Sequence, residues 1–275
     1  MIPLFILPFD HRGSFALDLL DVTFPVHGKN KKILEECKMM IYEAVLEAKS
    51  TYRGSGALGV LVDEELGSAV IRRAKKDGIP LSLTTEASGH DVFRFVHGAA
   101  FGVVLNKIHP TWAKALAYYT VGDEKKNKAT RKKLRQLSDF CEKEGIDFML
   151  EVLVGEEKGK GKEESVSAMI REMQNDGIAP SIWKLEGLEK ARDWDVVAKT
   201  ANAPLIVLGR GESQKQVDAW VKSAAQSGRV MGFAIGRTVF LKPLQQYIAG
   251  TLTKKSTITT IAKNYVHAIK VWEDA

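Results

Sequence analysis

Short apolar runs alternate with amphipathic helical patterns along this 275-residue chain, and this alternation constrains the fold more than any other feature. The runs have the length of buried strands, and residues that favour turns bound them. Eight strands are predicted, over residues 4–8, 58–62, 81–85, 113–118, 147–153, 182–185, 205–208 and 231–234. Helices are predicted between most of them and at the end of the chain, over residues 31–49, 67–76, 129–144, 165–176, 214–227 and 258–272.

Eight alternating strands and helices in about 250 residues favour a parallel sheet that closes into a single (β/α)8 barrel, the TIM-barrel architecture of the α/β class. The alternative is an open doubly wound sheet. Its dinucleotide-binding form needs a G-x-G-x-x-G turn after the first strand, where this chain has Asp10-His11-Arg12-Gly13. No linker divides the sequence, so we expect one domain over residues 1–275. The charged segment 155–163 is predicted to be a plain loop, with a mobile lid as the alternative.

The composition suits a globular protein and narrows the class of partner. No apolar run reaches the ~20 residues of a membrane-spanning helix, and the apolar segment 2–9 lacks the basic lead of a signal peptide. Cys37 and Cys141 lie far apart without C-x-x-C spacing, which indicates a reducing cytoplasm. The net charge of +6 suits anionic metabolites, and no nucleic-acid-binding motif accompanies it. We expect a cytoplasmic protein with a small-molecule partner and neither nucleic acid nor membrane; a homo-oligomer stays open.

Lys184 lies inside one of the apolar runs that are predicted to be strands. A lysine in such a strand points into the protein interior or into a cleft, where burial disfavours the ammonium form. A neutral amine is what an enzyme needs to form a Schiff base with a carbonyl. The alternative is a structural lysine that is paired with a carboxylate such as Glu186.

Other charged residues stand in or directly after predicted strands. Lys114 and Glu151 fall in the fourth and fifth strands, and Asp10 and Asp63 follow the first and second. Because catalytic groups of barrel enzymes lie at the carboxyl ends of the strands, we expect these side chains to surround Lys184. A nearby Lys114 would favour the neutral form of the reactive amine, and Glu151 would move protons. Asp10 and Asp63 would orient or deprotonate a substrate hydroxyl.

The last two predicted strands are followed by turns that contain glycine and arginine. Loops after strands seven and eight are the usual phosphate site of (β/α)8 barrels. Glycines let backbone N–H groups approach a phosphate, and an arginine at the start of a helix adds its guanidinium. Tight turns with a surface arginine are the alternative. The predicted substrate- and phosphate-binding residues are Arg12, Gly209, Arg210, Gly211, Gly232, Gly236 and Arg237.

The histidines do not form a metal-binding pattern. His11, His90, His97 and His109 lack the H-x-x-x-H or H-E-x-x-H spacing of a helical zinc site. We therefore predict no metal. Surface or loop positions are expected for these histidines, although His90 and His97 could line a pocket.

Four stretches carry a resemblance to a known family: 7–15 (LPFDHRGSF), 62–67 (VDEELG), 86–91 (EASGHD) and 183–186 (WKLE). They resemble class I aldolase barrels, and most of all the aldolase-like DUF2090 domain at the C-terminus of some bacterial inositol-catabolism kinases. The likeness runs through nearly the whole chain. Tagatose-1,6-bisphosphate aldolase is similar more distantly, with an Asp-x-Arg-Gly after strand one, a Lys-x-Glu strand six and a Gly-Arg after strand eight. The resemblance implies Lys184 as nucleophile, Glu151 as proton shuttle, Lys114 as electrostatic partner, Arg237 with its glycines as phosphate clamp, and no cofactor.

The resemblance also implies an activity. It is that of a Schiff-base aldolase that cleaves a phosphorylated keto sugar or keto sugar acid to dihydroxyacetone phosphate and an aldehyde, most like 2-deoxy-5-keto-gluconate-6-phosphate aldolase. The turn at Arg210 differs from the one expected in the kinase-fused branch, and an arginine there could hold a second phosphate or a carboxylate. Fructose- or tagatose-1,6-bisphosphate therefore stays open as the substrate. An isomerase or lyase that forms no imine also stays open, as does a non-catalytic sugar-phosphate binding module.

Overall fold

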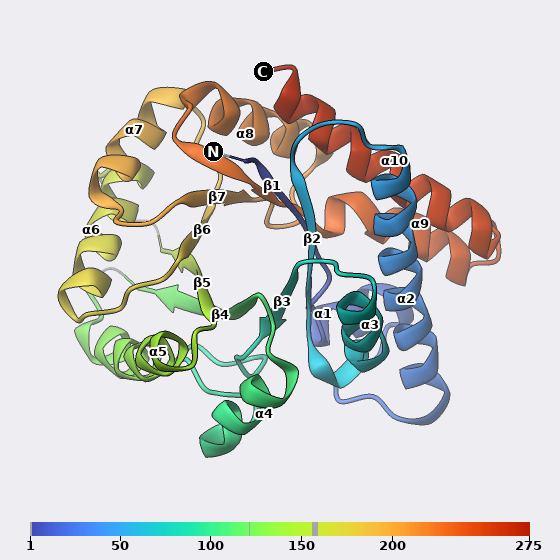
Figure 1. The fold of residues 1–275 in the computed structure, drawn as a ribbon, viewed down its shortest axis with the longest axis horizontal. Coiled ribbons are helices and arrows are strands. Elements are labelled where there is room, and N and C mark those ends of the chain that lie inside the picture. Colours follow the sequence, from blue (N-terminus) through green and yellow to red (C-terminus); the bar gives the residue numbers. More distant parts are fainter. Residues whose placement is uncertain (1, 121, 156–158) are drawn as a thin grey trace.

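The chain forms a closed barrel of eight parallel strands with helices around the outside (Figure 1). The computed structural model describes residues 2–120, 122–155 and 159–275. Each strand pairs with its neighbour in sequence, and β1 also pairs with β8, which closes the barrel. The strands are β1 Leu4–Pro8, β2 Ala57–Val62, β3 Leu81–Thr84, β4 Trp112–Tyr119, β5 Asp147–Val154, β6 Ile182–Glu186, β7 Leu205–Leu208 and β8 Val230–Ala234.

This architecture confirms the predicted (β/α)8 barrel. All eight predicted strands are present, and each begins and ends within one residue of its predicted bounds. The helices are α1 Gly13–Leu20, α2 Gly28–Thr51, α3 Glu64–Lys76, α4 Phe101–Ile108, α5 Glu124–Glu144, α6 Lys162–Asn175, α7 Ala191–Thr200, α8 Gln214–Ser227, α9 Arg237–Ile248 and α10 Lys254–Glu273. Part of the predicted loop 155–163 lies outside the described residues, and α6 begins at Lys162, within that segment.

The two-residue period of the strands separates the two sides of the barrel wall. Along each strand, every second side chain packs outward against the helices in a large apolar core, and the side chains between them point into the barrel. The inner set is apolar near the amino ends of the strands, where Ile6, Met149, Ile182 and Ile206 pack together. Two residues further along β5 and β6, on the same inner face, the chain has Glu151 and Lys184.

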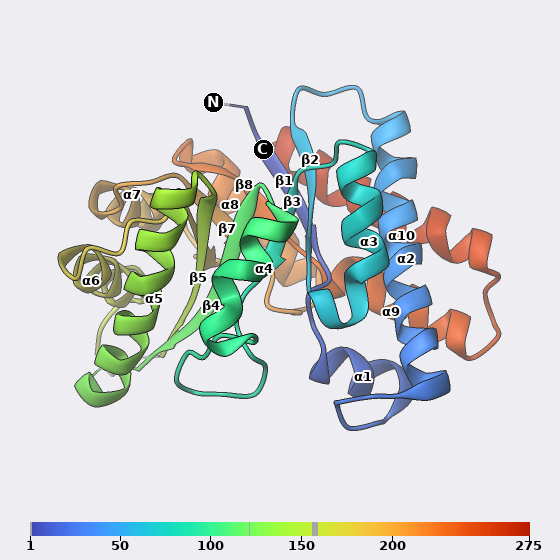
Figure 2. The same cartoon turned by 60° about the horizontal axis from the view of Figure 1, so that its bottom comes forward.

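The carboxyl ends of the strands therefore meet at one end of the barrel. In Figure 2 the chain enters β1 near the N-terminus at the top and leaves it toward α1 at the bottom, so this end faces down. The segment between β3 and α4 lies at the same end (Figure 2), and an antiparallel bridge between Glu86 and Phe95 closes it into a turn. None of the helices in the described part of the chain is both long and apolar enough to span a bilayer.

Candidate active site

A cavity of about 340 Å³ opens at the carboxyl ends of the strands. Charged side chains from β4, β5 and β6 form its floor, and segments after β1, β3, β7 and β8 form its wall. Of the predicted site residues, those that line it are Asp10, Arg12, Lys114, Glu151, Lys184, Gly209, Arg210, Gly211, Gly236 and Arg237.

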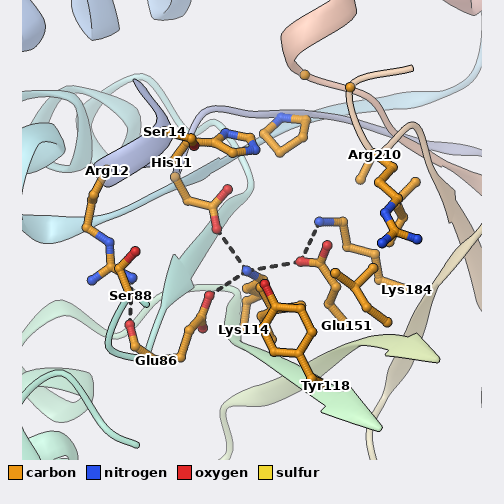
Figure 3. A pocket seen from close by; sticks show the side chains of 18 of the residues that line it. His11, Arg12, Ser14, Glu86, Ser88, Lys114, Tyr118, Glu151, Lys184 and Arg210 are labelled. Atoms are coloured by element: carbon orange, nitrogen blue, oxygen red, sulfur yellow. Dashed lines mark hydrogen bonds and ion pairs between the residues drawn. The ribbon is translucent and has the colours of Figure 1, made fainter. Parts of the chain in front are cut away.

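Lys184 lies on the floor of this cavity and is almost completely buried. Its Nζ donates to Oε2 of Glu151, the neighbouring residue on β5, over 2.7 Å. The same carboxylate oxygen lies 3.0 Å from Nζ of Lys114 on β4. The three side chains project from successive strands into one space (Figure 3). A single carboxylate thus bridges the two lysines and is within proton-transfer distance of both.

Lys114 is the centre of a larger cluster. Its Nζ lies 2.8 Å from Asp10, 2.7 Å from Glu86 and 3.0 Å from Glu151 (Figure 3). Burial alone would lower the pKa of Lys114, but the three carboxylates outweigh it and raise the pKa well above its usual value of 10.5. Lys114 therefore stays cationic and supplies a fixed positive charge beside Lys184.

Two of the carboxylates around these lysines, Asp10 and Glu151, remain ionised. Burial opposes the charge of Asp10, yet Lys114 and other nearby positive groups hold the pKa of Asp10 well below 3.8. Asp10 also accepts a hydrogen bond of 2.9 Å from Thr84. For Glu151, Lys114 and Lys184 likewise overcome burial and lower the pKa below its usual value. Both groups are therefore present as proton acceptors at neutral pH.

Arg12 lines the cavity, but its contacts are to the protein. Its Nη1 donates to Glu65 over 2.8 Å and its Nη2 to the backbone oxygen of Glu86 over 2.7 Å. These bonds hold the start of the segment after β3 against the end of β1. The phosphate-binding role of Arg12 stays a prediction, because these two bonds use two of its five N–H groups and its buried Nε has no acceptor among the described residues.

The turns after β7 and β8 form the opposite wall. Arg210, in the left-handed conformation with φ 52°, pairs with buried Glu186, and its carbonyl accepts from Arg237. Gly211, with φ 82°, leaves room for the Arg237 guanidinium, which a Cβ there would meet at 2.6 Å. Arg237 is the first residue of α9, so its side chain and the helix N-terminus face the same region. This arrangement is suited to an anion.

Two residues that the sequence places in the site lie outside the cavity. Asp63 pairs with the buried Lys38 of α2 and caps α3 by accepting from the backbone N–H of Leu66 over 2.8 Å. Gly232 is paired with Leu4 near the amino end of the barrel, where a Cβ would collide with the Leu4 backbone. Both predictions are corrected: Asp63 secures a helix start, and Gly232 allows β8 to approach β1.

Further lining residues were not among the predicted site residues. They are chiefly Ser14, Glu86, Ser88, Tyr118, His11 and His90, most of which are seen around the cavity in Figure 3. Burial together with the nearby cations Arg237, Lys184 and Lys38 lowers the pKa of His11 from 6.5 to about 4, against the pull of Asp10. The buried Nδ1 of His11 has no hydrogen-bond partner among the described residues. The position of Glu86, directly after the predicted strand 81–85, was the available signal in the sequence.

Two of the predicted loop histidines lie outside the cavity. His97 contacts Glu64 over 2.7 Å, and His109 is the C-cap residue of α4. Within the described ranges, no group of three or more histidine, cysteine, aspartate or glutamate side chains is arranged to hold a metal ion.

The fold and the lysine-centred cavity define a (β/α)8 barrel with a polar site at the carboxyl ends of its strands. The chain belongs to the family described as "Uncharacterized protein conserved in bacteria (DUF2090)", whose model matches residues 2–275. No curated protein matches the sequence.

Solved structures with a similar fold include several aldolases. A Schiff base forming fructose-1,6-bisphosphate aldolase is 15% identical with a TM-score of 0.60, over 95% of this chain and 93% of that one. An archaeal fructose-1,6-bisphosphate aldolase, solved with its catalytic lysine covalently bound to a carbinolamine intermediate, is 14% identical with a TM-score of 0.58, over 96% and 94%. The YdjI aldolase from Escherichia coli K12 is 12% identical with a TM-score of 0.58, over 98% and 91%. At these identities the likeness establishes the shared fold.

Proposed function

We propose that this protein is a Schiff-base aldolase that cleaves a phosphorylated keto sugar to dihydroxyacetone phosphate and an aldehyde. The observation that carries the proposal is the contact of 2.7 Å between the buried amine of Lys184 and Glu151, on the floor of a cavity at the carboxyl ends of the strands. A nucleophile with an adjacent base is the arrangement that amine catalysis requires. The similar fold of the Schiff base forming aldolase supports the same mechanism.

In this mechanism Glu151 takes a proton from the Lys184 ammonium, and the free amine attacks the keto carbon of the substrate. Glu151 then returns a proton to the carbinolamine oxygen, which leaves as water and gives an iminium. The hydroxyl on the leaving carbon gives its proton to the ionised carboxylate of Asp10, its oxygen forms the aldehyde carbonyl, and the electron pair of the carbon–carbon bond moves into the iminium, which becomes an enamine. Protonation of the enamine and hydrolysis release dihydroxyacetone phosphate and restore Lys184. Because the iminium accepts the electron pair, the chemistry requires no metal.

The substrate phosphate is proposed to bind at Arg237. Its guanidinium makes no ion pair with a carboxylate among the described residues, and it lies at the start of α9 beside Gly211. Charge-assisted bonds from a guanidinium and a helix N-terminus suit a phosphate. The chain's resemblance favours 2-deoxy-5-keto-gluconate 6-phosphate as the substrate. Fructose- or tagatose-1,6-bisphosphate is the second candidate, and Arg210 beside Arg237 is the observation that favours it.

The test is reduction with borohydride in the presence of dihydroxyacetone phosphate, followed by peptide mass spectrometry. A reduced adduct on Lys184 is expected, with none in Lys184→Met. An adduct on Lys114 instead would reassign the nucleophile, since Lys114 lies on the same floor. Binding without any adduct would favour a binding module or an enzyme that forms no imine. Cleavage that is abolished by a chelator and restored by a divalent cation would contradict the mechanism.

A further inference from the structure

The imidazole ring of His11 lines the cavity and has no hydrogen-bond partner among the described residues. It lies shortly after β1, apart from the hydrogen-bonded cluster around Lys114 (Figure 3). Its Nδ1 is buried and unpartnered. Its Nε2 likewise has no hydrogen bond to a described residue but is not buried in this way, so Nε2 is the ring nitrogen that opens into the cavity. A polar atom that is open to a cavity and unsatisfied by the protein is available to a ligand.

The surroundings of the His11 ring decide which nitrogen carries its proton. A neutral histidine has one N–H donor and one acceptor nitrogen, and buried N–H groups without an acceptor are rarer than unsatisfied acceptors. A proton on Nδ1 would be such a donor, so the neutral ring carries its proton on Nε2. Burial lowers the pKa of His11 to about 4, and the nearby cations Arg237 and Lys184 act in the same direction. His11 therefore presents an uncharged Nε2–H donor to the cavity at neutral pH.

This donor lies beside the start of α9. The His11 ring packs edge-on against Phe240, one turn into that helix, with the ring centroids 6.4 Å apart. The end of β1 and the start of α9 are in direct contact, since a Cβ at Gly236 would collide with the carbonyl oxygen of Pro8. Gly236 is the N-cap of α9 and has no side chain that could accept from the first N–H groups of the helix. The imidazole donor, the Arg237 guanidinium and these N–H groups therefore border one region of the cavity.

We propose that His11 is a further substrate-binding residue, whose Nε2–H donates a hydrogen bond to a phosphate oxygen of the substrate beside Arg237. The inference deepens the proposed function and rests on its phosphate site. The guanidinium and the helix N-terminus supply the positive potential, and the imidazole adds a directed bond without adding charge. Asp10, the preceding residue, faces Lys114 instead. Two consecutive residues would thus contact different parts of the substrate, Asp10 a hydroxyl and His11 the phosphate.

The first experiment uses wild-type protein with isotope-labelled histidine, near neutral pH, and inorganic phosphate as the probe. Nuclear magnetic resonance reports the nitrogen shifts of the ring, and the His11 signals are assigned by their absence from His11→Phe. The Nε2–H form is expected, and its Nε2 signal should move as phosphate saturates the site. The same phosphate concentration should leave it unmoved in Arg237→Met. A proton on Nδ1, an Nε2 signal that bound phosphate does not move, or a wild-type protein that binds no phosphate would overturn the inference.

Variants of His11 separate the donor from the ring. His11→Phe keeps an aromatic ring against Phe240 but removes the donor, so its Kd for inorganic phosphate, measured by calorimetry, is expected to rise about 10- to 100-fold. His11→Gln places an amide N–H near the position of Nε2 and is expected to stay within about fivefold of wild type. His90→Phe is the matched control, because His90 lines the same cavity from the segment after β3. It should bind phosphate as wild type does, and an equally unchanged Kd in His11→Phe would contradict the proposal.

Borohydride trapping on Lys184 separates this inference from the proposed function. The concentration of dihydroxyacetone phosphate that half-saturates trapping should rise about 10- to 100-fold in His11→Phe, whereas that of unphosphorylated dihydroxyacetone should not change. Equal losses for both compounds would place the His11 bond on the triose and overturn the phosphate contact. Phosphate binding that depends on His11, in a wild-type protein that forms no adduct, would sink the proposed function alone. An adduct with unaltered phosphate binding in His11→Phe would sink the role of His11 alone.

Discussion

Two buried lysines of this protein meet carboxylates in contrasting surroundings. Lys38, on α2, is fully buried and binds Asp63 and the carbonyl oxygen of His11, the latter over 3.0 Å. Lys114, on β4, is nearly as buried but faces three carboxylates on the floor of an open cavity. Burial lowers the pKa of Lys38 despite the attraction of Asp63, whereas the pKa of Lys114 is raised well above 10.5 because its carboxylates outweigh burial.

The difference shows that burial of a charge does not by itself mark a site. The Lys38 pair is closed: one cation meets one carboxylate and a carbonyl, and the carboxylate also caps a helix. The Lys114 cluster is open: it borders a cavity and leaves an oxygen of Glu86 without a donor among the described residues. Closed pairs join elements of the fold, while a cluster that borders a cavity and places several carboxylates around one cation is suited to a ligand.

The largest effect on activity is expected when Lys114, the cation of the open cluster, is replaced. Lys114→Met is expected to lower kcat of cleavage about 10³- to 10⁴-fold, because Asp10, Glu86 and Glu151 lose the charge that orients them. The fold should survive, since cavity water can solvate the freed carboxylates. Steady-state kinetics and the melting temperature measure the two effects. A variant with kcat within threefold of wild type would show that Lys114 is as structural as Lys38.

Replacing Lys38, the cation of the closed pair, should lower stability and leave the catalytic rate largely unchanged. Lys38→Met leaves the Asp63 charge buried without a partner and is expected to lower the free energy of unfolding by about 3–5 kcal/mol. The catalytic rate per folded molecule should change much less. Urea titration measures the loss. Adding Asp63→Asn, which removes the charge but keeps an oxygen to cap α3, should recover part of the stability, and an unaltered stability in the single variant would contradict the assignment.

The anion site at the turns after β7 and β8 gives a third, smaller effect. Arg237→Met is expected to raise KM for a phosphorylated substrate about 10- to 100-fold while kcat changes little, because the lost bond binds substrate and transition state alike. Arg229→Met is the control, as Arg229 is exposed and pairs with Asp195 away from the cavity. An equal fall of kcat in Arg237→Met, without a change of KM, would place this residue in the chemical step instead.

His11 connects the two regions, since its carbonyl binds Lys38 and its ring lines the cavity. Its pKa is lowered from 6.5 to about 4 by burial and by Arg237, Lys184 and Lys38. Between these values the unfolded chain binds a proton that the folded chain does not, so stability is expected to fall as pH falls from 6.5 toward 4. The loss is on the order of 1 kcal/mol, because cavity water screens the ring. Urea titrations across this range should show a flatter profile for His11→Gln than for His90→Gln, and equal profiles would refute the assignment.

Much of the fold follows from local pattern in the sequence. The apolar runs and their lengths identified all eight strands, because burial on both faces of a barrel wall leaves near-continuous apolar segments. Four helices that the structure contains, α1, α4, α7 and α9, were not identified. Two of them have only eight residues and α9 contains Pro243, so their periodic signal is weak.

The candidate site was predicted best where it lies on strands. Glu151 and Lys184 are register partners on β5 and β6, and Lys114 lies on β4 two residues before the partner of Glu151, on the same inner face. Residues after the strands were predicted less well. Asp10 lines the cavity, but Asp63 binds Lys38 and caps the start of α3. A strand fixes the direction of each side chain by its two-residue period, whereas a loop leaves that direction to distant contacts.

The amino-acid sequence by itself determined the alternation of strands and helices, the closed barrel and the inward charges of β4, β5 and β6, because each depends on the period and polarity of neighbouring residues. Only the tertiary structure decided that Lys38 closes with Asp63, that Arg12 holds Glu86, and that Oε2 of Glu86 faces no donor among the described residues. These features depend on which side chains meet across elements far apart in the chain. Such meetings are set by the packing of the whole barrel, which no local window of the sequence contains.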